Sequence, residues 1–210
     1  FAVIFDSARK NFRNEIYKDY KANRSEAPDD LIPQFDFIRK SVLAFNLPSI
    51  EMLNYEADDL IATYVDQILK IGAKVTIVSS DKDLMQLYKK GVRIYDPMKN
   101  KFIKEEDVQD KFGVTSDKVI DVQSLAGDSS DNVPGVPGIG VKTAAELINK
   151  YGNLENLLQK ATEIKQNKRR ETILENKEKA LISKKLVTLK KDVPVKERLE
   201  NFILKEVDKD

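Results

Sequence analysis

The apolar positions near the start of the chain predict one strand followed by two helices. Residues 2–5 form an apolar run typical of a buried strand, and Asp6 ends it. Residues 9–24 are predicted to form a basic helix, because apolar side chains recur there every four residues. A second helix is predicted over residues 29–45, after the start signal at Pro28. The apolar stripe of the first helix consists of Phe12, Ile16 and Tyr20.

The next part of the chain alternates strand and helix patterns. Such alternation predicts an α/β fold, with a mostly parallel sheet and helices on both of its faces. The amphipathic helix that opens at Glu56 has the strongest pattern, and Gly72 ends it. The predicted strands are residues 49–53, 74–79 and 92–95, and a further helix begins at residues 84–87.

The pattern changes near residue 104, after which helices joined by short turns are predicted. Glycine and proline concentrate in residues 132–140, and a helix is predicted over 141–151. Residues 161–191 hold ten basic and four acidic side chains, a local net charge of +6. The predicted organisation is an α/β core with an arch in residues 1–126, a helical module in 127–190 and a C-terminal tail in 191–210.

Composition narrows the possible chemistry more than it identifies a partner. The 210 residues include 36 basic and 35 acidic side chains, so the net charge of +1 does not indicate nucleic acid. The chain has no Cys and no His, which excludes thiolate and imidazole chemistry and leaves oxygen ligands for Mg²⁺ or Mn²⁺. The absence of a membrane span or signal peptide favours the cytoplasm. The chain opens on Phe1 within a strand, so we expect a fragment that begins inside a domain.

Acidic side chains gather where the predicted strands end and where helices begin. Sites in open α/β sheets form at the carboxyl ends of the strands. Each acidic pair alone is more often a helix cap or a solvated surface group. Four such groups that converged would repel one another unless cations were bound, and two metal ions can hydrolyse a phosphodiester. The groups are Asp6; Glu56, Asp58 and Asp59; Asp81 and Asp83; and Asp128 and Asp131.

Two basic features could hold phosphates. On the predicted helix 9–24, one face would carry Arg13, Tyr17, Lys21 and Arg24, although an ordinary surface helix explains this pattern equally well. The second feature is the segment 135–144, where glycines precede a helix whose N-terminus can bind phosphate. A dinucleotide-binding turn is a poor match, because no strand precedes these glycines. The candidate DNA contacts of the segment 135–144 are Gly135, Gly138, Gly140, Lys142 and Thr143.

Read in order, these motifs resemble a known family. The first motifs along the chain are Phe5-Asp6, Phe12-Arg13, Tyr17, Tyr20-Lys21 and Arg24. They are followed in order by Glu56-Ala57-Asp58-Asp59, Asp81-Lys82-Asp83, Gly127-Asp128-Ser129-Ser130-Asp131-Asn132 and the glycine segment. Together they are similar to the 5′-nuclease domain of bacterial DNA polymerase I, within the flap endonuclease family. The similarity extends from residue 1 to about residue 190.

The resemblance implies a two-metal nuclease that acts on 5′ flaps and on nicked or gapped duplex DNA. It implies that Asp6, Glu56 and Asp58 hold one metal ion. It places Lys21 and Arg24 in a helical arch, where they neutralise the scissile phosphate, with Arg13 and Tyr17 beside them. The second metal would be held by Asp81, Asp83, Asp128 and Asp131, with Asp59 nearby.

The glycine segment resembles a helix-hairpin-helix element within a helix–three-turn–helix module. That likeness implies a K⁺ ion bound by the main-chain carbonyls of Pro134, Val136 and Ile139. It further implies a monomer that works in replication and repair, joined to a polymerase domain. The family pattern also includes an earlier strand with another metal-binding Asp, which this chain lacks, so weak or no activity is expected of these residues alone.

Two alternatives remain open from the residues. A catalytically inactive DNA-binding fragment or paralogue would use the hairpin and the basic residues, but it would gain nothing from eight acidic side chains near a phosphate. A phosphatase with Asp6 as the nucleophile would need a second Asp two residues later, where this chain has Ala8.

Overall fold

Two short parallel strands begin the fold. The computed structural model describes residues 1–205, and strands β1 (Val3–Ile4) and β2 (Ser49–Ile50) pair in parallel. The backbone N–H of Phe5 extends the pairing by donating to the Ile50 carbonyl at 2.8 Å. This geometry sends Asp6 out at the carboxyl end of β1, as the sequence predicts.

Helix α3 (Ala57–Lys70) follows and begins with its own acidic residues. Glu56 is the N-cap, and its backbone N–H donates to the Asp59 carboxylate at 3.1 Å. Leu60, Tyr64 and Val65 on its apolar face are buried, and the Tyr64 ring centre lies 4.9 Å from that of Phe202. The helix ends at Lys70, and Gly72 follows with a φ of +76°, a conformation that favours glycine.

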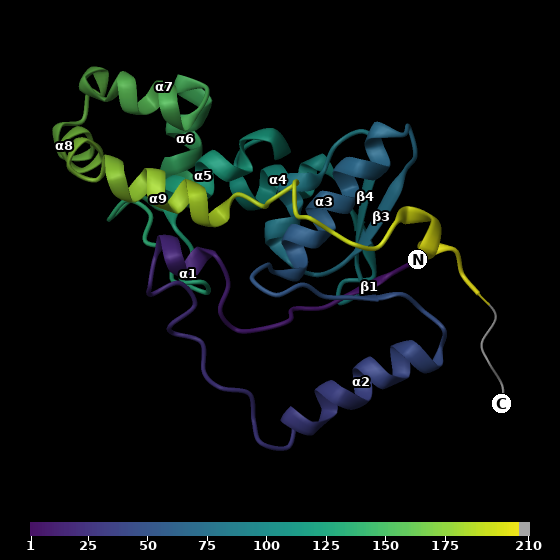
Figure 1. The fold of residues 1–210 in the computed structure, drawn as a ribbon. Coiled ribbons are helices and arrows are strands. Elements are labelled where there is room, and N and C mark those ends of the chain that lie inside the picture. Colours follow the sequence, from purple (N-terminus) through teal and green to yellow (C-terminus); the bar gives the residue numbers. More distant parts are fainter. Residues whose placement is uncertain (206–210) are drawn as a thin grey trace.

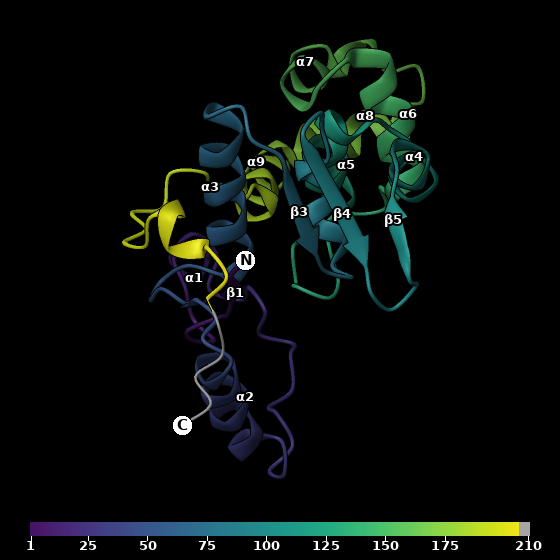
Figure 2. The same cartoon turned by 90° about the vertical axis from the view of Figure 1, so that its right-hand side faces the viewer.

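A separate three-stranded sheet carries the next strands, and it corrects the predicted layering. β3 (Val75–Val78) pairs in parallel with β4 (Val92–Asp96), and β4 pairs antiparallel with β5 (Lys101–Ile103). Within β3 and β4, buried residues alternate with more exposed ones, as in a sheet covered on one face. Helices therefore cover one face, and the other is open in the described residues (Figure 2). The α/β class is confirmed, whereas helices on both faces of this sheet are not found.

The predicted basic helix over residues 9–24 is wrong. Only α1 (Arg13–Ile16) is helical there, and Lys21 has a φ of +56°. Side-chain amides compete with helical hydrogen bonds, since Asn11 Oδ1 accepts from the Arg13 N–H at 2.8 Å. The second prediction holds, because α2 spans Ile32–Ala44. It buries none of its residues and extends away from the body of the molecule (Figure 1).

The remaining helices pack around α5. Helix α5 contacts α6 and α9, and one hydrophobic core runs from the β3–β5 sheet into these helices. They gather on one side of the molecule, away from β1 and α2 (Figure 1). The helices are α4 (Glu105–Phe112), α5 (Val119–Ala126), α6 (Val141–Tyr151), α7 (Leu154–Gln159), α8 (Asn167–Glu175) and α9 (Lys177–Val187). Short 3₁₀ helices are η1 (Lys82–Leu87), η2 (Ser116–Lys118), η3 (Ala161–Glu163) and η4 (Leu199–Phe202).

Within residues 1–205, no helix is long and apolar enough to cross a membrane. The predicted tail runs to residue 210, and its last five positions lie outside the described residues.

Candidate metal centre

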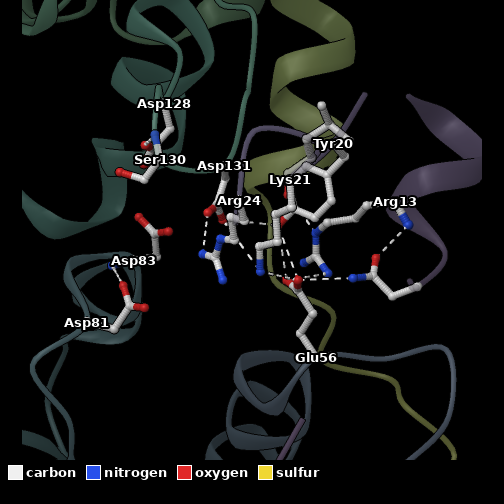
Figure 3. Close-up of polar contacts among 12 residues, drawn as sticks. Arg13, Tyr20, Lys21, Arg24, Glu56, Asp81, Asp83, Asp128, Ser130 and Asp131 are labelled. Carbon is white, nitrogen blue, oxygen red and sulfur yellow. Dashed lines mark hydrogen bonds and ion pairs between the residues drawn. The ribbon is translucent and has the colours of Figure 1, made fainter. Parts of the chain in front are cut away.

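One cleft collects carboxylates from three distant parts of the chain. Glu56 and Asp58 come from the start of α3. Asp81 and Asp83 come from the turn after β3, and Asp128 and Asp131 come from the loop after α5 (Figure 3). The same cleft is lined by Arg13, Tyr20, Lys21 and Arg24. The predicted convergence of the acidic groups is therefore found for six residues: Glu56, Asp58, Asp81, Asp83, Asp128 and Asp131.

Local hydrogen bonds fix two of the acidic groups in place. Asp81 caps η1, because its carboxylate accepts from the Asp83 N–H at 2.9 Å. Asp128 accepts from the Ser130 N–H at 2.8 Å, and its backbone exchanges two hydrogen bonds with Val133. These bonds hold each carboxylate at the end of a rigid element.

A pair of glycines closes the loop that carries Asp128 and Asp131. Gly127 and Gly135 have φ values of +70° and +58° and lie back to back. A Cβ on Gly135 would lie 2.4 Å from the Gly127 nitrogen, so any larger residue would force the loop open. Gly135 is buried by this contact, and its predicted contact with DNA stays a prediction.

Three of the carboxylates have no ion pair with a basic residue in the described part of the chain: Asp58, Asp81 and Asp83. Burial, together with the nearby carboxylates of Asp81, Glu56, Asp83 and Asp6, raises the pKa of Asp58 to about 8. Burial and Asp81 raise the pKa of Asp83 to about 6, although the Gln123 amide opposes this shift. This group therefore concentrates negative charge that a divalent cation can neutralise.

The raised pKa of Asp58 predicts that Asp58→Asn stabilises the metal-free protein at pH 8. Between about pH 3.8 and pH 8, Asp58 keeps its proton in the folded state but has lost it in the unfolded chain. The contribution of Asp58 to stability therefore falls as the pH rises through that window. Thermal melts in chelator should show a higher Tm for the variant at pH 8 and a smaller difference at pH 5. A variant that is less stable at both pH values would contradict this account.

Basic side chains neutralise the other carboxylates. Lys21 pairs with Glu56 and lies 3.6 Å from Asp131, which also pairs with Arg24 (Figure 3). Lys82 pairs with Asp128. In this arrangement, no three acidic side chains of the described residues stand as a ready ligand set for one metal ion. The donor set of carboxylate oxygens still suits Mg²⁺ or Mn²⁺, provided that these ion pairs open.

Two predicted site residues, Arg13 and Asp59, are buried and bind each other. Arg13 binds Asp59 through two hydrogen bonds of 2.7 and 2.8 Å, and their exposed fractions are 1% and 0%. Asp59 also accepts from the Lys190 N–H at 2.9 Å. Asp59 is thus enclosed by Arg13, while Arg13 also lies 3.2 Å from Glu56 and lines the cleft, so metal binding by Asp59 and DNA contact by Arg13 stay predictions.

Asp6 and Tyr17 lie at the edges of the site. The Asp6 carboxylate accepts from the Ala57 N–H at 2.7 Å at the start of α3, and it raises the pKa of Asp58. Tyr17 is partly buried and packs against the cluster of Tyr20, Val133 and Leu186. Binding of metal by Asp6 and of DNA by Tyr17 both stay predictions.

Sequence reasoning missed three residues that hold the acidic groups. The Tyr20 hydroxyl donates to Glu56 at 3.1 Å and lies 3.2 Å from Asp131, although its spacing indicated only an apolar stripe. Gln123 Nε2 donates to Asp83 at 2.6 Å. The position of Lys82 between two aspartates was a usable signal, whereas nothing in the sequence pointed to Gln123.

The glycine segment forms the turn between α5 and α6. Val136 and Ile139 are buried and anchor the turn, and the Ile139 N–H donates to the Val136 carbonyl at 3.0 Å. Gly138 and Gly140 are exposed, and a Cβ at either position would meet open space. Gly140 is the N-cap of α6. The predicted helix, turn and helix are therefore found, while the K⁺ site at Pro134, Val136 and Ile139 stays a prediction.

Two family models together match the whole chain. A model described as the 5′-3′ exonuclease N-terminal resolvase-like domain matches residues 1–113. A model for the 5′-3′ exonuclease C-terminal SAM fold matches residues 114–210. The chain belongs to the 5′-3′ exonuclease family. The models meet between residues 113 and 114, and the division predicted after residue 126 stays a prediction.

Individual relatives agree with this assignment. The chain is 57% identical to DNA polymerase I of Rhizobium leguminosarum over 203 residues, covering 97% of this chain and 20% of that protein. It is 40% identical to a 5′-3′ exonuclease of Buchnera aphidicola subsp. Acyrthosiphon pisum, covering 97% of this chain and 73% of the relative. The chain thus spans about a fifth of the polymerase and about three quarters of the exonuclease.

Solved structures share the fold. Bacteriophage T5 5′-exonuclease with bound zinc has a TM-score of 0.79 at 24% identity, covering 89% of this chain and 73% of the other. The catalytic core of Rad2 with a DNA substrate has a TM-score of 0.61 at 18% identity, covering 98% and 70%. At these identities the likeness supports the fold alone.

Proposed function

We propose that the intact protein containing this chain is a metal-dependent 5′-nuclease that hydrolyses DNA phosphodiesters, as a 5′-3′ exonuclease and 5′-flap endonuclease in replication and repair. One observation carries the proposal. Six carboxylates line one cleft together with Lys21 and Arg24, and three of the six have no basic partner among the described residues. Such a cleft suits divalent cations and a phosphate at the same time.

The carboxylates would divide between two divalent ions, Mg²⁺ or Mn²⁺. One group is Asp6, Glu56 and Asp58, and the other is Asp81, Asp83, Asp128 and Asp131. When bound, such a pair of ions activates water and stabilises the leaving oxygen. Asp81 and Asp128 present their carboxylates in fixed positions, because backbone N–H groups hold them.

Lys21 and Arg24 would bind the scissile phosphate. Both now pair with Glu56 or Asp131, so each already reaches the centre of the cleft. A basic side chain that leaves its carboxylate can donate to a phosphate oxygen without a large movement of the backbone. Residues 25–31 and α2 extend from the body next to Lys21 and Arg24, and we propose that they form the arch.

Metal dependence tests the proposed activity directly. Cleavage of a labelled 5′-flap duplex by the intact protein should stop in excess chelator and return with added Mg²⁺ or Mn²⁺. Equal cleavage in chelator and in Mg²⁺ would contradict a metal-dependent nuclease. The variant Asp83→Asn distinguishes a nuclease from a DNA-binding protein without activity. It should abolish cleavage if the protein is a nuclease. If the protein only binds DNA, there is no cleavage to lose and DNA affinity should stay the same or rise.

The exposed turn before α6 would bind the DNA backbone through Gly138, Gly140, Lys142 and Thr143. Lys142→Ala should lower the slope of log affinity against log salt concentration by about one unit, because one phosphate contact releases about one counterion. Lys150→Ala, at the other end of the same helix, is the matched control and should leave the slope unchanged. A slope unaffected by Lys142→Ala would remove this residue from the interface.

The setting of the activity is also a proposal. We infer a monomer that acts on flaps and on nicked or gapped duplex DNA in the cytoplasmic nucleoid, joined to a polymerase domain. The support is that relatives named DNA polymerase I match this chain over about a fifth of their length. A K⁺ ion at the carbonyls of Pro134, Val136 and Ile139 would strengthen the contact of the hairpin with the backbone.

A further inference from the structure

A second cavity lies beside the acidic cleft and is unlike it. This groove, which we call the α1–α9 groove, has a volume of about 750 Å³ and shares Leu189 with the wall of the cleft. Helix α1 lies alongside α9 at this place (Figure 1). Its remaining lining comprises Phe12, Ile16, Leu181 and Thr188 with the charged residues Glu155, Lys184, Lys185, Lys190, Lys191 and Asp192.

The floor of the groove is apolar and open to solvent. Ile16 and Leu181 are 38% and 43% exposed, on facing helices. The Phe12 ring is held in place by the Arg13 guanidinium, 4.6 Å from its centre, and by the Tyr55 ring at 5.9 Å. Covering these side chains would remove apolar surface from water, which contributes about 25 cal/mol per Å². A fixed aromatic ring that shares a groove with two exposed aliphatic side chains is a preformed apolar site.

The rim of the groove is basic. It carries four lysines and two acidic residues, a local net charge of +2. Lys184 is engaged by Asp121 and Glu155 at 2.8 and 2.6 Å. Lys185 and Lys191 form no ion pair among the described residues, so both ammonium groups are available to an anionic partner.

We propose that the α1–α9 groove binds an acidic peptide segment of a partner protein. The segment places an apolar side chain on Phe12 between Ile16 and Leu181, and its carboxylates pair with Lys185 and Lys191. Apolar burial supplies the affinity, and the charges fix the direction of the peptide.

Nucleic acid fits this groove less well. Each strand of duplex DNA carries a phosphate about every 3.4 Å of helix axis, so along this rim it would place charges beside Glu155 or Asp192. Phosphates also leave the aliphatic floor uncovered. A peptide can space its carboxylates to meet the two unpaired lysines and still bury an apolar side chain.

Fluorescence polarisation with the intact protein tests this inference. The probe is a fluorescein-labelled 12-residue peptide in which pairs of Asp or Glu alternate with Leu or Phe. We expect a Kd on the order of 10–100 μM, within the range of short-peptide recognition. Replacing the apolar residues by Ser, or the acidic residues by Asn and Gln, should weaken binding at least about tenfold, because each half of the site is needed.

Matched variants locate the site on the protein. Lys185→Glu with Lys191→Glu should weaken binding at least about tenfold, and Leu181→Ser at least about fivefold. Lys168→Glu with Lys179→Glu makes the same charge change on exposed positions outside the groove and should have little effect beyond general electrostatics.

Three results would overturn the proposal. The first is a Kd weaker than 1 mM for the peptide. The second is an equal loss of binding in the groove variants and in the control pair. The third is a single-stranded oligonucleotide that binds as tightly as the peptide and loses affinity with the same groove substitutions, which would make this a nucleic-acid surface. Melting temperatures of all variants should match that of the parent protein.

Discussion

Asp128→Ala is expected to lower the rate of DNA cleavage by the intact protein on the order of a thousandfold, as removal of a preorganised electrostatic group at a reacting centre does. The carboxylate is 8% exposed, and the Ser130 N–H and Lys82 hold it at the wall of the cleft. Asp81→Ala should have an effect of similar size, because Asp81 belongs to the unpaired acidic group. Single-turnover rates on a 5′-flap duplex provide the measurement.

A matched control separates catalysis from folding. Asp121 is also 8% exposed and pairs with a lysine, but it lies outside the cleft. Asp121→Ala should leave the cleavage rate within a few fold of the parent value. DNA affinity should be kept or rise in Asp128→Ala, because a negative charge near the phosphate is removed. Normal cleavage by both Asp81→Ala and Asp128→Ala would contradict the two-metal proposal.

Arg13→Ala is expected to lower the free energy of unfolding by about 3–5 kcal/mol, because it leaves the buried carboxylate of Asp59 without its charge partner. Arg13 also donates to the Leu186 carbonyl at 2.7 Å, so it connects α1, α3 and the end of α9. Chemical denaturation in urea measures this loss. Metal-dependent cleavage per folded molecule should fall less than stability does, because Asp59 is fully buried and Arg13 spends its hydrogen bonds on Asp59 and the Leu186 carbonyl.

Two further variants show whether the stability lost in Arg13→Ala comes from the unpaired buried charge. Arg39→Ala removes a half-buried surface arginine paired with Glu51 at 3.0 Å, and it should cost about 1 kcal/mol or less. Arg13→Met combined with Asp59→Leu should recover much of the lost stability, because no buried charge is then left unpaired. A loss from Arg13→Ala as small as that from Arg39→Ala would contradict a structural role for the buried pair.

The error over residues 9–24 shows where periodicity fails. Of the predicted stripe Phe12, Ile16 and Tyr20, only Tyr20 is buried, and the segment is helical only over Arg13–Ile16. Backbone N–H groups of this segment donate to other partners: that of Arg13 to the Asn11 side chain, and that of Lys21 to the Asp131 carbonyl at 2.9 Å. Such a partner 110 residues away leaves no periodic trace in the sequence.

The sequence by itself determined the α/β class, the helix-turn-helix order of the second half and the set of acidic residues from which the metal centre is drawn. These follow from local patterns, because strand ends, helix caps and glycine turns depend on neighbouring residues. Only the tertiary structure decided which of the adjacent carboxylates face the cleft. Asp58 and Asp59 are both in the first turn of α3, but their side chains leave the helix about 100° apart. Arg13 and the backbone of Lys190 enclose Asp59, while Asp58 turns toward Asp81. That choice depends on how α1 and α9 pack on α3, and no local pattern contains it.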